Sequence, residues 1–375
     1  MRRNPFITSG YEGPEYFCDR QKETSELTRL VRNGNNVVLM SPRRMGKTGL
    51  LHHCFGQDGI GKEYLTFIID ILPTSDLSDM VMTMGKAMLS RLMPSGQRAA
   101  AKFIRAVSTL RPTVSLDPMG NADFSIETVR PSSPEYTLEQ IFSYIEESDR
   151  RLLIAMDEFQ QVTCYPEKNV EAVLRTYIQS SKNSTWIFSG SSRHLLSEMF
   201  LVPSRPFYSS ASFLSLEPIP CETYAAFAER LFRDSGKRLD AAVPKLVYDK
   251  FEGVTWFMQK VMNRLYSDTA PGEVCNPPMV EYAVSEIVKG NGAIYMDLLY
   301  QLSSRQKELL LAINREGRAE AITSGSFVKK HSLQSPSTVQ TAAKALVERQ
   351  MVTFNKGVYE VYDKFFSLWL SSCGI

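Results

Sequence analysis

The chain has 375 residues, of which 43% are hydrophobic and 22% are charged, and its formal net charge at pH 7 is +2. This balance is typical of a globular protein with room for two or three domains, and the small net charge gives no sign that the whole chain binds nucleic acid or membrane. The longest apolar runs are too short to cross a bilayer, which argues against a membrane-spanning protein.

The cysteines and the N-terminus indicate the compartment. Six cysteines are scattered without a C-x-x-C pair, and the four histidines show no metal-ligand spacing, so we expect no metal site built from these residues. Residues 1–5 carry two arginines with no apolar run behind them, and we expect no secretion signal. The sequence therefore predicts a cytoplasmic protein with reduced thiols and no membrane partner.

Residues 36–216 alternate short apolar runs with helical stretches, after a loop-rich start and a helix that ends near residue 32. The apolar runs are nearly continuous in Val, Ile, Leu and Phe, as expected for strands covered on both faces. We therefore predict an α/β fold with a parallel sheet. Its strands are expected at Val37–Met40, 65–71, 152–156 and 185–189, and a turn-rich segment predicts a hairpin inserted at about residues 112–130.

Residues 41–48 follow the first strand and match the phosphate-binding pattern G-x-x-x-x-G-K-[ST], except that Ser41 replaces the first glycine. In such a loop, backbone N–H groups and the N-terminus of the next helix bind phosphates. Lys47 is expected to reach the β- and γ-phosphates, and Thr48 to bind Mg²⁺. The loop residues expected to contact nucleotide are Ser41, Arg43, Arg44, Met45, Gly46, Lys47, Thr48 and Gly49. Arg43 and Arg44 either pair with phosphates, pair with a carboxylate of a neighbouring domain, or are exposed charges.

An acidic pair follows the strand predicted at residues 152–156. Asp157 is expected to hold Mg²⁺ through water, and Glu158 to orient or deprotonate an attacking water. Taken alone, Gly-Lys-Thr occurs in loops by chance, and an Asp-Glu pair often begins a solvated helix. Both motifs together, each after its own strand, predict an ATPase.

The remaining chain is mostly helical. Residues 217–295 show no convincing strand. In residues 296–375, Ser303 begins a helix with Gln306 placed to complete a capping box, a second short helix follows, and Pro336 opens a third helix. Two short apolar runs around a turn then predict a hairpin. Three helices followed by a hairpin predict a winged helix-turn-helix.

Five stretches resemble, in order, the prokaryotic AAA-type ATPase family often called archaeal ATPases, which is related to the STAND signalling NTPases and the Orc/Cdc6 initiators. They are SPRRMGKTGLL, AMDEFQQV, WIFSGSSRHLLSEMF, RPFYSSASFLSLEPI and YEVYDKFFSLWL. The resemblance runs from about residue 4 to residue 370. It implies an N-terminal segment with a P-loop ATPase core at residues 1–216, a helical lid at 217–295 and a winged-helix domain at 296–375, which agrees with the order of elements above.

The resemblance also implies roles for residues outside the two motifs. Residues 16–23 look like the family's N-terminal box, which implies that Phe17 and Arg20 border the adenine. The strand at 185–189 looks like the sensor strand, which implies that Arg193 reads the γ-phosphate and stabilises the charge of the transferring group. Arg205 is a second candidate for this role or for an arginine finger that reaches a neighbouring subunit.

The sequence departs from the family at two adenine-binding elements. Asp19 replaces a glycine of the N-terminal box. In the lid, Thr255 stands where relatives have a proline that packs on adenine. In that case either Trp256 contacts the adenine from the lid, or the lid makes no adenine contact.

Residues 303–375 contain ten Lys or Arg and six Asp or Glu, a difference of +4. On the third helix, only Gln340 and Lys344 are residue types that commonly read base edges. Lys329, Lys330 and Lys356 could contact phosphates. A DNA partner and a protein partner of the winged helix both stay open.

We therefore predict an ATP/ADP-binding, Mg²⁺-dependent P-loop ATPase that acts as a nucleotide-controlled conformational switch with slow turnover. The predicted catalytic residues are Glu158, Lys47 and Arg193, and the predicted metal ligands are Thr48 and Asp157. The alternatives are a DNA-binding regulator or mobile-element protein, or an interaction scaffold, in which nucleotide is bound but not turned over. Assembly into an oligomer is kept open, since an arginine finger would require it.

Overall fold

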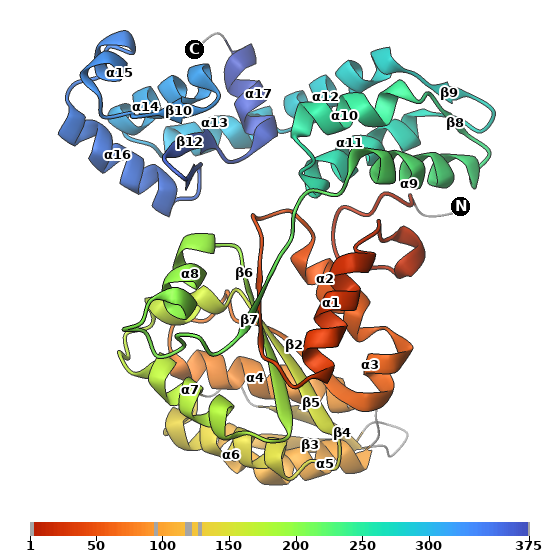
Figure 1. The fold of residues 1–375 in the computed structure, drawn as a ribbon, viewed down its shortest axis with the longest axis vertical. Coiled ribbons are helices and arrows are strands. Elements are labelled where there is room, and N and C mark those ends of the chain that lie inside the picture. The colour runs from red at the N-terminus through yellow and green to blue at the C-terminus, as the bar shows by residue number, and fades with distance from the viewer. Residues whose placement is uncertain (1–3, 94–96, 117–121, 127–129, 374–375) are drawn as a thin grey trace. The chain divides into compact units, whose positions relative to one another are not determined.

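The computed structural model describes residues 4–93, 97–116, 122–126 and 130–373. The chain divides into two compact units, which are described separately below (Figure 1). One unit is Ser9–Thr223, and the other combines Met1–Thr8 with Tyr224–Ile375. Among the described residues, no helix has both the length and the apolar character needed to cross a membrane.

The first unit is built on a five-stranded parallel sheet, which confirms the predicted α/β fold. Its strands are β1 (Val37–Met40), β2 (Tyr64–Asp70), β5 (Arg151–Asp157), β6 (Ser184–Gly190) and β7 (Ser212–Ser215), in the order β2-β5-β6-β1-β7. Four of these were predicted to within one residue at each end. The fifth, β7, was missed because its sequence Ser-Phe-Leu-Ser has no continuous apolar run, and it lies at the sheet edge.

Helices cover both faces of this sheet (Figure 1). They are α1 (Gln21–Arg32), α2 (Lys47–Phe55), α3 (Asp58–Glu63), α4 (Leu77–Leu92), α5 (Gln97–Ala106), α6 (Pro134–Glu146), α7 (Val170–Ser180) and α8 (Arg193–Leu201), with short 3₁₀ turns η1 (Pro14–Tyr16), η3 (Ser108–Leu110) and η4 (Phe159–Cys164). Alternate strand residues serve opposite faces: Val37 and Leu39 pack with α1, α2 and α3, whereas Val38 packs with the other face. This burial on two sides explains the continuous apolar runs.

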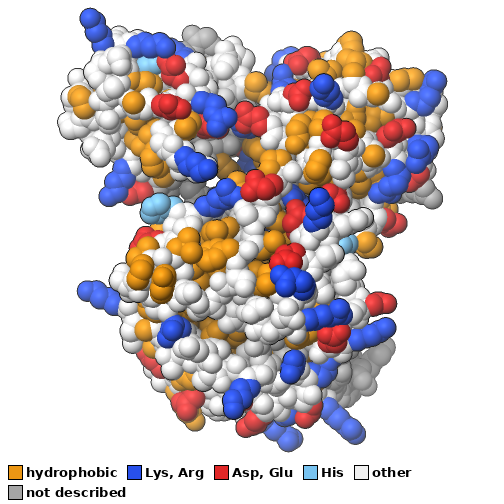
Figure 2. Space-filling view, viewed as in Figure 1, with side chains coloured by type: hydrophobic (Ala, Val, Ile, Leu, Met, Phe, Trp, Pro, Cys, Tyr) orange, Lys and Arg blue, Asp and Glu red, His pale blue; other side chains and the backbone are white. Residues whose placement is uncertain are grey.

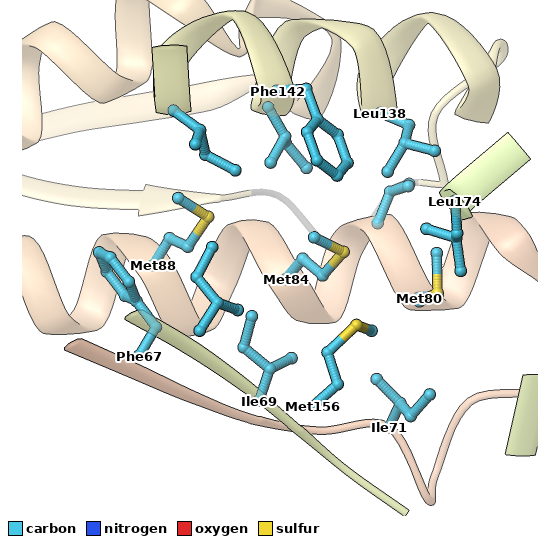
Figure 3. Close-up of a cluster of buried hydrophobic side chains, with 14 of the residues drawn as sticks. Phe67, Ile69, Ile71, Met80, Met84, Met88, Leu138, Phe142, Met156 and Leu174 are labelled. Carbon is cyan, nitrogen blue, oxygen red and sulfur yellow. The ribbon is translucent and has the colours of Figure 1, made fainter. Parts of the chain in front are cut away.

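The second face carries the larger core, which Figure 3 shows in part. Met80, Met84 and Met88 lie four residues apart on α4, so they form one stripe that meets the strands. They pack beside Phe67 and Met156, and all five side chains are almost fully buried. The flexible thioethers fill the space between strands and α6 without branched side chains.

An antiparallel pair, β3 (Pro112–Leu116) and β4 (Ala122–Ile126), stands apart from the main sheet, at the site of the predicted hairpin. The turn of this predicted hairpin lies outside the described residues. This pair interrupts the alternation of strand and helix between α5 and α6.

The second unit is mainly helical and ends in a winged helix, as predicted. Its elements are most of α9 (Cys221–Arg233), then β8 (Arg238–Leu239), α10 (Ala242–Phe251), α11 (Thr255–Asp268), β9 (Val274–Cys275), α12 (Pro277–Gly290), α13 (Gly292–Tyr300), α14 (Ser304–Glu316), β10 (Ala319–Glu320), α15 (Gly325–Lys330), α16 (Pro336–Glu348), β11 (Val352–Asn355), β12 (Val358–Val361) and α17 (Lys364–Ser372). The capping box of Ser303 and Gln306 is formed at the start of α14. β11 and β12 make the predicted hairpin, and β10 adds a third strand.

Two features of this unit differ from the prediction. The region expected to lack strands contains β8 and β9, a two-residue parallel pair that is too short to leave a sequence pattern. The N-terminal segment, expected with the ATPase core, has Phe6 fully buried against Phe227 and Phe232. The Asn263 side chain donates to the Phe6 carbonyl at 2.8 Å, so residues 4–8 belong to the helical unit.

Candidate active site

The loop between β1 and α2 turns through two residues with left-handed backbone. Its left-handed residues are Arg44 (φ 67°) and Gly46 (φ 89°), and Ser41 is not among them. A glycine is therefore not required at position 41, where the buried Ser41 hydroxyl donates to the Pro42 carbonyl at 2.8 Å. The loop forms despite its missing first glycine, and the free N–H groups of the first turn of α2 follow it.

Lys47 is the first residue of α2 and is only 7% exposed. Burial lowers the pKa of its ammonium group, while the carboxylates of Glu158 and Asp157 act in the opposite direction. A buried ammonium group facing two carboxylates is held in place electrostatically, and a bound anion would offset its desolvation further.

Asp157, at the end of β5, is 6% exposed and joins the loop to two strands. Its Oδ2 accepts a hydrogen bond from the Thr48 hydroxyl at 2.7 Å, and its Oδ1 accepts one from the Ser189 hydroxyl of β6 at 2.6 Å. The strand register places Asp70, the last residue of β2, opposite Asp157. The pKa of Asp70 is raised by burial and, to a smaller extent, by the charges of Asp157 and Glu158.

The Thr48 and Asp157 oxygens fit a magnesium ion that is also bound by phosphates. Mg²⁺ prefers oxygen ligands and usually keeps several waters, with one or two carboxylates and substrate phosphates completing its shell. Among the described residues, no three His, Cys, Asp or Glu side chains are grouped closely enough to hold a metal. Thr48 and Asp157 are therefore the residues of this site that could hold Mg²⁺ together with phosphates.

Glu158 lies in the left-handed region, with φ 56° and ψ 42°. Its Oε2 accepts hydrogen bonds from the Ser191 N–H at 3.2 Å, the Ser191 hydroxyl at 2.7 Å and the Gln160 amide at 2.5 Å. We call Ser191 and Gln160 the Glu158 clamp. Gly190 makes room for it, since a Cβ there would lie 2.0 Å from the Gln160 Oε1. The clamp reaches the loop because Arg43 Nε donates to the Ser191 hydroxyl at 2.9 Å.

Arg193 begins α8, and its guanidinium contacts the last residue of β7 and the segment after it. It donates to the Ser215 hydroxyl at 2.8 Å and lies 3.6 Å from the Glu217 carboxylate. Arg205 forms a close ion pair with Glu171, whose pKa is nonetheless raised, chiefly by burial.

Arg20 is 3% exposed and ties three parts of the unit together. Its guanidinium pairs with Glu23 at 2.6 Å and donates to the carbonyls of Met45 at 3.3 Å and Glu217 at 2.7 Å. Met45 is itself almost fully buried in the loop. The loop, α1 and the segment after β7 are therefore held by one buried arginine.

Phe17 packs on the first turn of α2, where a Cβ on Gly49 would lie 3.3 Å from its ring. The Phe17 ring stacks on His53 with centroids 4.6 Å apart, and the Tyr11 hydroxyl contacts His53 Nδ1 at 2.9 Å. Burial lowers the pKa of both His52 and His53, which favours the neutral form of each imidazole. Neither Tyr11 nor the adjacent histidines His52 and His53 of α2 were singled out from the sequence.

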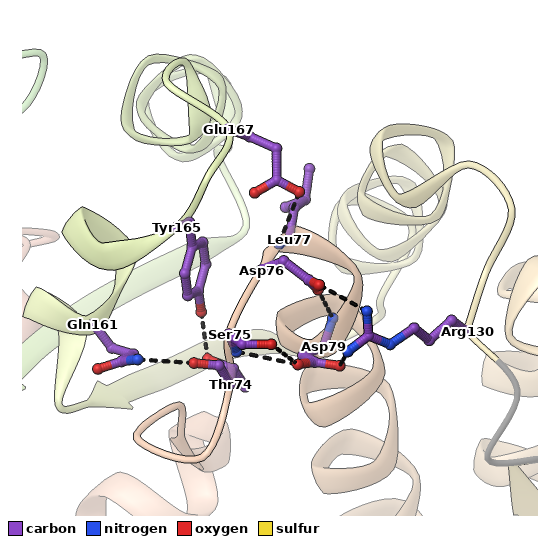
Figure 4. Close-up of polar contacts among 9 residues, drawn as sticks. All are labelled: Thr74, Ser75, Asp76, Leu77, Asp79, Arg130, Gln161, Tyr165 and Glu167. Atoms are coloured by element: carbon purple, nitrogen blue, oxygen red, sulfur yellow. Dashed lines mark hydrogen bonds and ion pairs between the residues drawn. The ribbon is translucent and has the colours of Figure 1, made fainter.

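The chain that follows Glu158 is fixed by a separate polar network (Figure 4). Thr74 lies in the loop after β2, and its hydroxyl contacts the Tyr165 hydroxyl. The Thr74 backbone carbonyl accepts a hydrogen bond from the Gln161 side-chain amide at 2.8 Å. Burial raises the pKa of Tyr165 to about 12. Arg130 pairs with Asp76 at 2.8 Å at the start of α4. This network holds η4, and with it the clamp residue Gln160.

The comparisons with known proteins identify a family and a common fold. A family model described as an ATPase domain predominantly from Archaea matches residues 17–256, and one described as a probable winged helix domain matches residues 293–372. No curated protein matches the sequence.

Among solved structures, the chain is similar to a Walker-type ATPase of Pyrococcus abyssi, with 17% identity, a TM-score of 0.67, and coverage of 98% of this chain and 99% of that one. It is also similar to the ORC2 protein of Aeropyrum pernix in ADPNP and ADP complexes, with 15% identity, a TM-score of 0.58, and coverage of 99% and 98%. The ORC1 protein of the same organism, in complex with DNA, shares 13% identity with a TM-score of 0.54 over 96% and 94% of the two chains. These likenesses show a common fold.

Proposed function

The chain belongs to the family of ATPase domains found predominantly in Archaea, and we propose that it is a Mg²⁺-dependent ATPase that works as a slow, nucleotide-controlled conformational switch. The observation that carries this proposal is the position of Asp157, whose carboxylate accepts hydrogen bonds from Thr48 of the loop and Ser189 of the neighbouring strand. We further propose that the protein is cytoplasmic and related to the STAND group.

In this proposal, the loop N–H groups and the α2 N-terminus bind the phosphates, and Lys47 contacts the β- and γ-phosphates. Thr48 and Asp157 hold Mg²⁺, which when bound neutralises charge on the phosphate oxygens. Phe17, stacked on His53, and Arg20 border the adenine. This role is supported for Phe17 by its contact with the first turn of α2, and for Arg20 by its hydrogen bond to the loop carbonyl of Met45.

Glu158 is proposed to orient and deprotonate the attacking water. A general base must be within hydrogen-bond reach of that water, but its Oε2 is occupied by Ser191 and Gln160. We infer that the clamp, by holding Oε2, fixes the direction of the carboxylate and must release it before Glu158 can turn toward the attacking water, which makes hydrolysis slow. Arg43 links this release to the phosphates, because a phosphate that attracts its guanidinium weakens its contact with Ser191.

The switch is proposed to act through residues 215–217, where the chain leaves the sheet. Arg20 joins the Glu217 carbonyl to the Met45 carbonyl of the loop, and Arg193 contacts Ser215 and the Glu217 carboxylate. A change in the loop or at the start of α8 is thereby passed to the segment that leads into the second unit. Arg193 is proposed to exchange Glu217 for the γ-phosphate, which would make it both sensor and catalytic residue.

The first experiment is calorimetry with ATP and with ADP in the presence of Mg²⁺, followed by phosphate release from the same sample. Binding of both nucleotides with release of phosphate is expected. Glu158→Gln should keep ATP binding and lose release. No ATP binding by the wild-type chain would refute the site, and unchanged release by Glu158→Gln would remove Glu158 from the mechanism.

The switch needs its own measurement. Cys164 and Cys373 are exposed and lie in different units, so a fluorescent donor and acceptor can be attached to them after Cys221→Ser. We expect different transfer efficiencies with ATP and ADP, and loss of this difference in the double variant Ser215→Ala/Glu217→Gln. The exposed neighbour Glu222→Gln serves as the control. Equal efficiencies with ATP and ADP would refute the switch while leaving the ATP site intact.

A DNA-binding regulator is the second candidate, favoured by the winged helix. The outer face of α16 exposes Gln340, Thr341 and Lys344, and the hairpin tip exposes Lys356. The charge of Lys344 is partly offset by Glu348, 3.9 Å away. Salt-dependent retention of DNA, lost in Lys344→Gln/Lys356→Gln, would support this function. A partner protein recovered without DNA retention would instead support a scaffold.

A further inference from the structure

One segment of the ATPase unit has a charge that the ATPase reaction does not use. Residues 80–116 contain six basic residues and no Asp or Glu, in a chain whose net charge is only +2. The six are Lys86, Arg91, Arg98, Lys102, Arg105 and Arg111, and all are exposed. Such a run at the surface is expected to attract anions.

Three of these residues line a shallow groove. α5 lies beside α6 at the lower end of the unit (Figure 1), and the groove between them has a volume of about 470 Å³. Its lining residues are Arg98, Ala101, Lys102, Arg105, Ala106, Tyr144 and Glu147. In this region Figure 2 shows a mostly polar surface with several basic side chains.

The three basic residues follow one face of α5, at positions i, i+4 and i+7. Lys102 donates to the Glu147 carbonyl at the end of α6 at 2.8 Å, which fixes the central cation. Arg98 and Arg105 lie about one turn to either side, and in the part of the chain that the structure describes neither has an ion pair or side-chain hydrogen bond. Among the described lining residues, the Glu147 carboxylate is the one acidic group.

The groove lacks an apolar anchor. Tyr144 is 4% exposed, and its ring packs edge-on against the buried Phe103, with centroids 4.9 Å apart. The other apolar lining residues are alanines. Peptide-docking grooves and membrane-binding helices rely on exposed aromatic or large aliphatic side chains, and single-stranded nucleic acids are bound by exposed aromatic rings. A peptide, a membrane and a single-stranded nucleic acid are therefore all unsuited to this surface.

We propose that this surface, the α5 groove, binds the phosphate backbone of duplex nucleic acid without reading its sequence. Arg98 and Arg105 are seven residues apart, about 10.5 Å along the helix, which spans about three phosphates of one strand at 3.4 Å each. The guanidinium fork is suited to phosphate oxygens. This proposal concerns a different surface from the winged helix, and it does not depend on ATP hydrolysis.

The test uses the full chain and fluorescence anisotropy of two labelled duplexes of about 20 base pairs and unrelated sequence, between about 50 and 200 mM salt. We expect equal affinity for both duplexes. In Arg98→Gln/Arg105→Gln, the slope of log affinity against log salt should fall in magnitude by about two, since each phosphate contact contributes about 0.9.

The matched control is Lys22→Gln/Arg29→Gln. These two exposed cations are also seven residues apart, on α1 of the same unit, and their removal changes the net charge equally. We expect the control to keep the wild-type slope and both double variants to keep the wild-type melting temperature. If the salt slope fell equally in both double variants, the effect would be one of net charge alone, and the proposal would be overturned.

Three further outcomes would overturn it. One is no duplex binding by the wild-type chain at about 50 mM salt. Another is a wild-type slope in Arg98→Gln/Arg105→Gln but a reduced slope in Lys344→Gln/Lys356→Gln, which would assign the DNA to the winged helix. The third is displacement of duplex by polyglutamate at equal charge concentration, which would point to an acidic protein partner.

Discussion

Replacing Ser191 by alanine should speed ATP hydrolysis. The Ser191 hydroxyl donates to Glu158 Oε2 at 2.7 Å, and both residues are half-buried. A hydrogen bond to a charged group contributes about 1.5 to 3 kcal/mol, and partial exposure reduces this to about 1 to 1.5 kcal/mol here. If release of Glu158 limits turnover, the same amount is removed from the barrier, and kcat should rise about 5- to 12-fold.

The assay is steady-state phosphate release at saturating ATP and Mg²⁺. Ser192→Ala is the matched control, because this neighbouring half-buried serine makes no side-chain cap to α8. Glu158→Gln/Ser191→Ala should be inactive, which would show that the gain passes through Glu158. A kcat for Ser191→Ala equal to or below that of the wild-type chain would mean that Ser191 aligns the base, and the reasoning about the clamp would be wrong.

Three other changes test the same structure. Lys47→Ala should abolish ATP binding in calorimetry, since it removes the buried ammonium group of the loop; tight binding by this variant would sink the site. Asp70→Asn should raise the melting temperature near neutral pH, because the folded state raises the pKa of Asp70 and so penalises its ionised form. That gain should disappear as the pH falls below the ordinary pKa of an aspartate, where both states are protonated; a gain that persists in acid would exclude this cause. Phe6→Ala should destabilise the helical unit by about 3 to 5 kcal/mol in denaturant unfolding, as expected for a fully buried phenylalanine, and a loss below about 1 kcal/mol would mean that residues 4–8 do not contribute to this core.

The sheet could be predicted because its strands are buried on both faces. Val37–Met40 carries the signal in four consecutive apolar residues. β7 could not be predicted, since only Phe213 and Leu214 are apolar in it and the strand is held mainly by backbone pairing with β1. The sequence also could not predict which unit residues 4–8 pack with, because the aromatic partners of Phe6 lie more than two hundred residues away in the chain.

The approach of the two motifs could be predicted, but their hydrogen bonds could not. Because parallel strands end at the same edge of a sheet, a motif after β1 and an acidic pair after β5 were expected at that edge. The clamp depends on finer features: the left-handed backbone of Glu158 and the absence of a Cβ at Gly190. No sequence pattern distinguishes Ser191 from its neighbour Ser192 as the residue that contacts Glu158.

Two arginines connect the loop between β1 and α2 to other parts of the unit. Arg43 connects the loop to the Glu158 clamp through Ser191, and Arg20 connects the loop carbonyl of Met45 to Glu217. Both connections are made by guanidinium groups, whose several donors in a plane allow one side chain to hold separate partners at once. In the proposed mechanism, a phosphate in the loop would compete for Arg43 directly. Arg20 is buried and donates to two carbonyls, so it would respond only to movement of the loop backbone. Binding of phosphate and movement of the loop would then act on hydrolysis and on the exit segment by separate routes, which is why Ser191→Ala should change the rate of turnover without changing the difference in energy transfer between the ATP and ADP states.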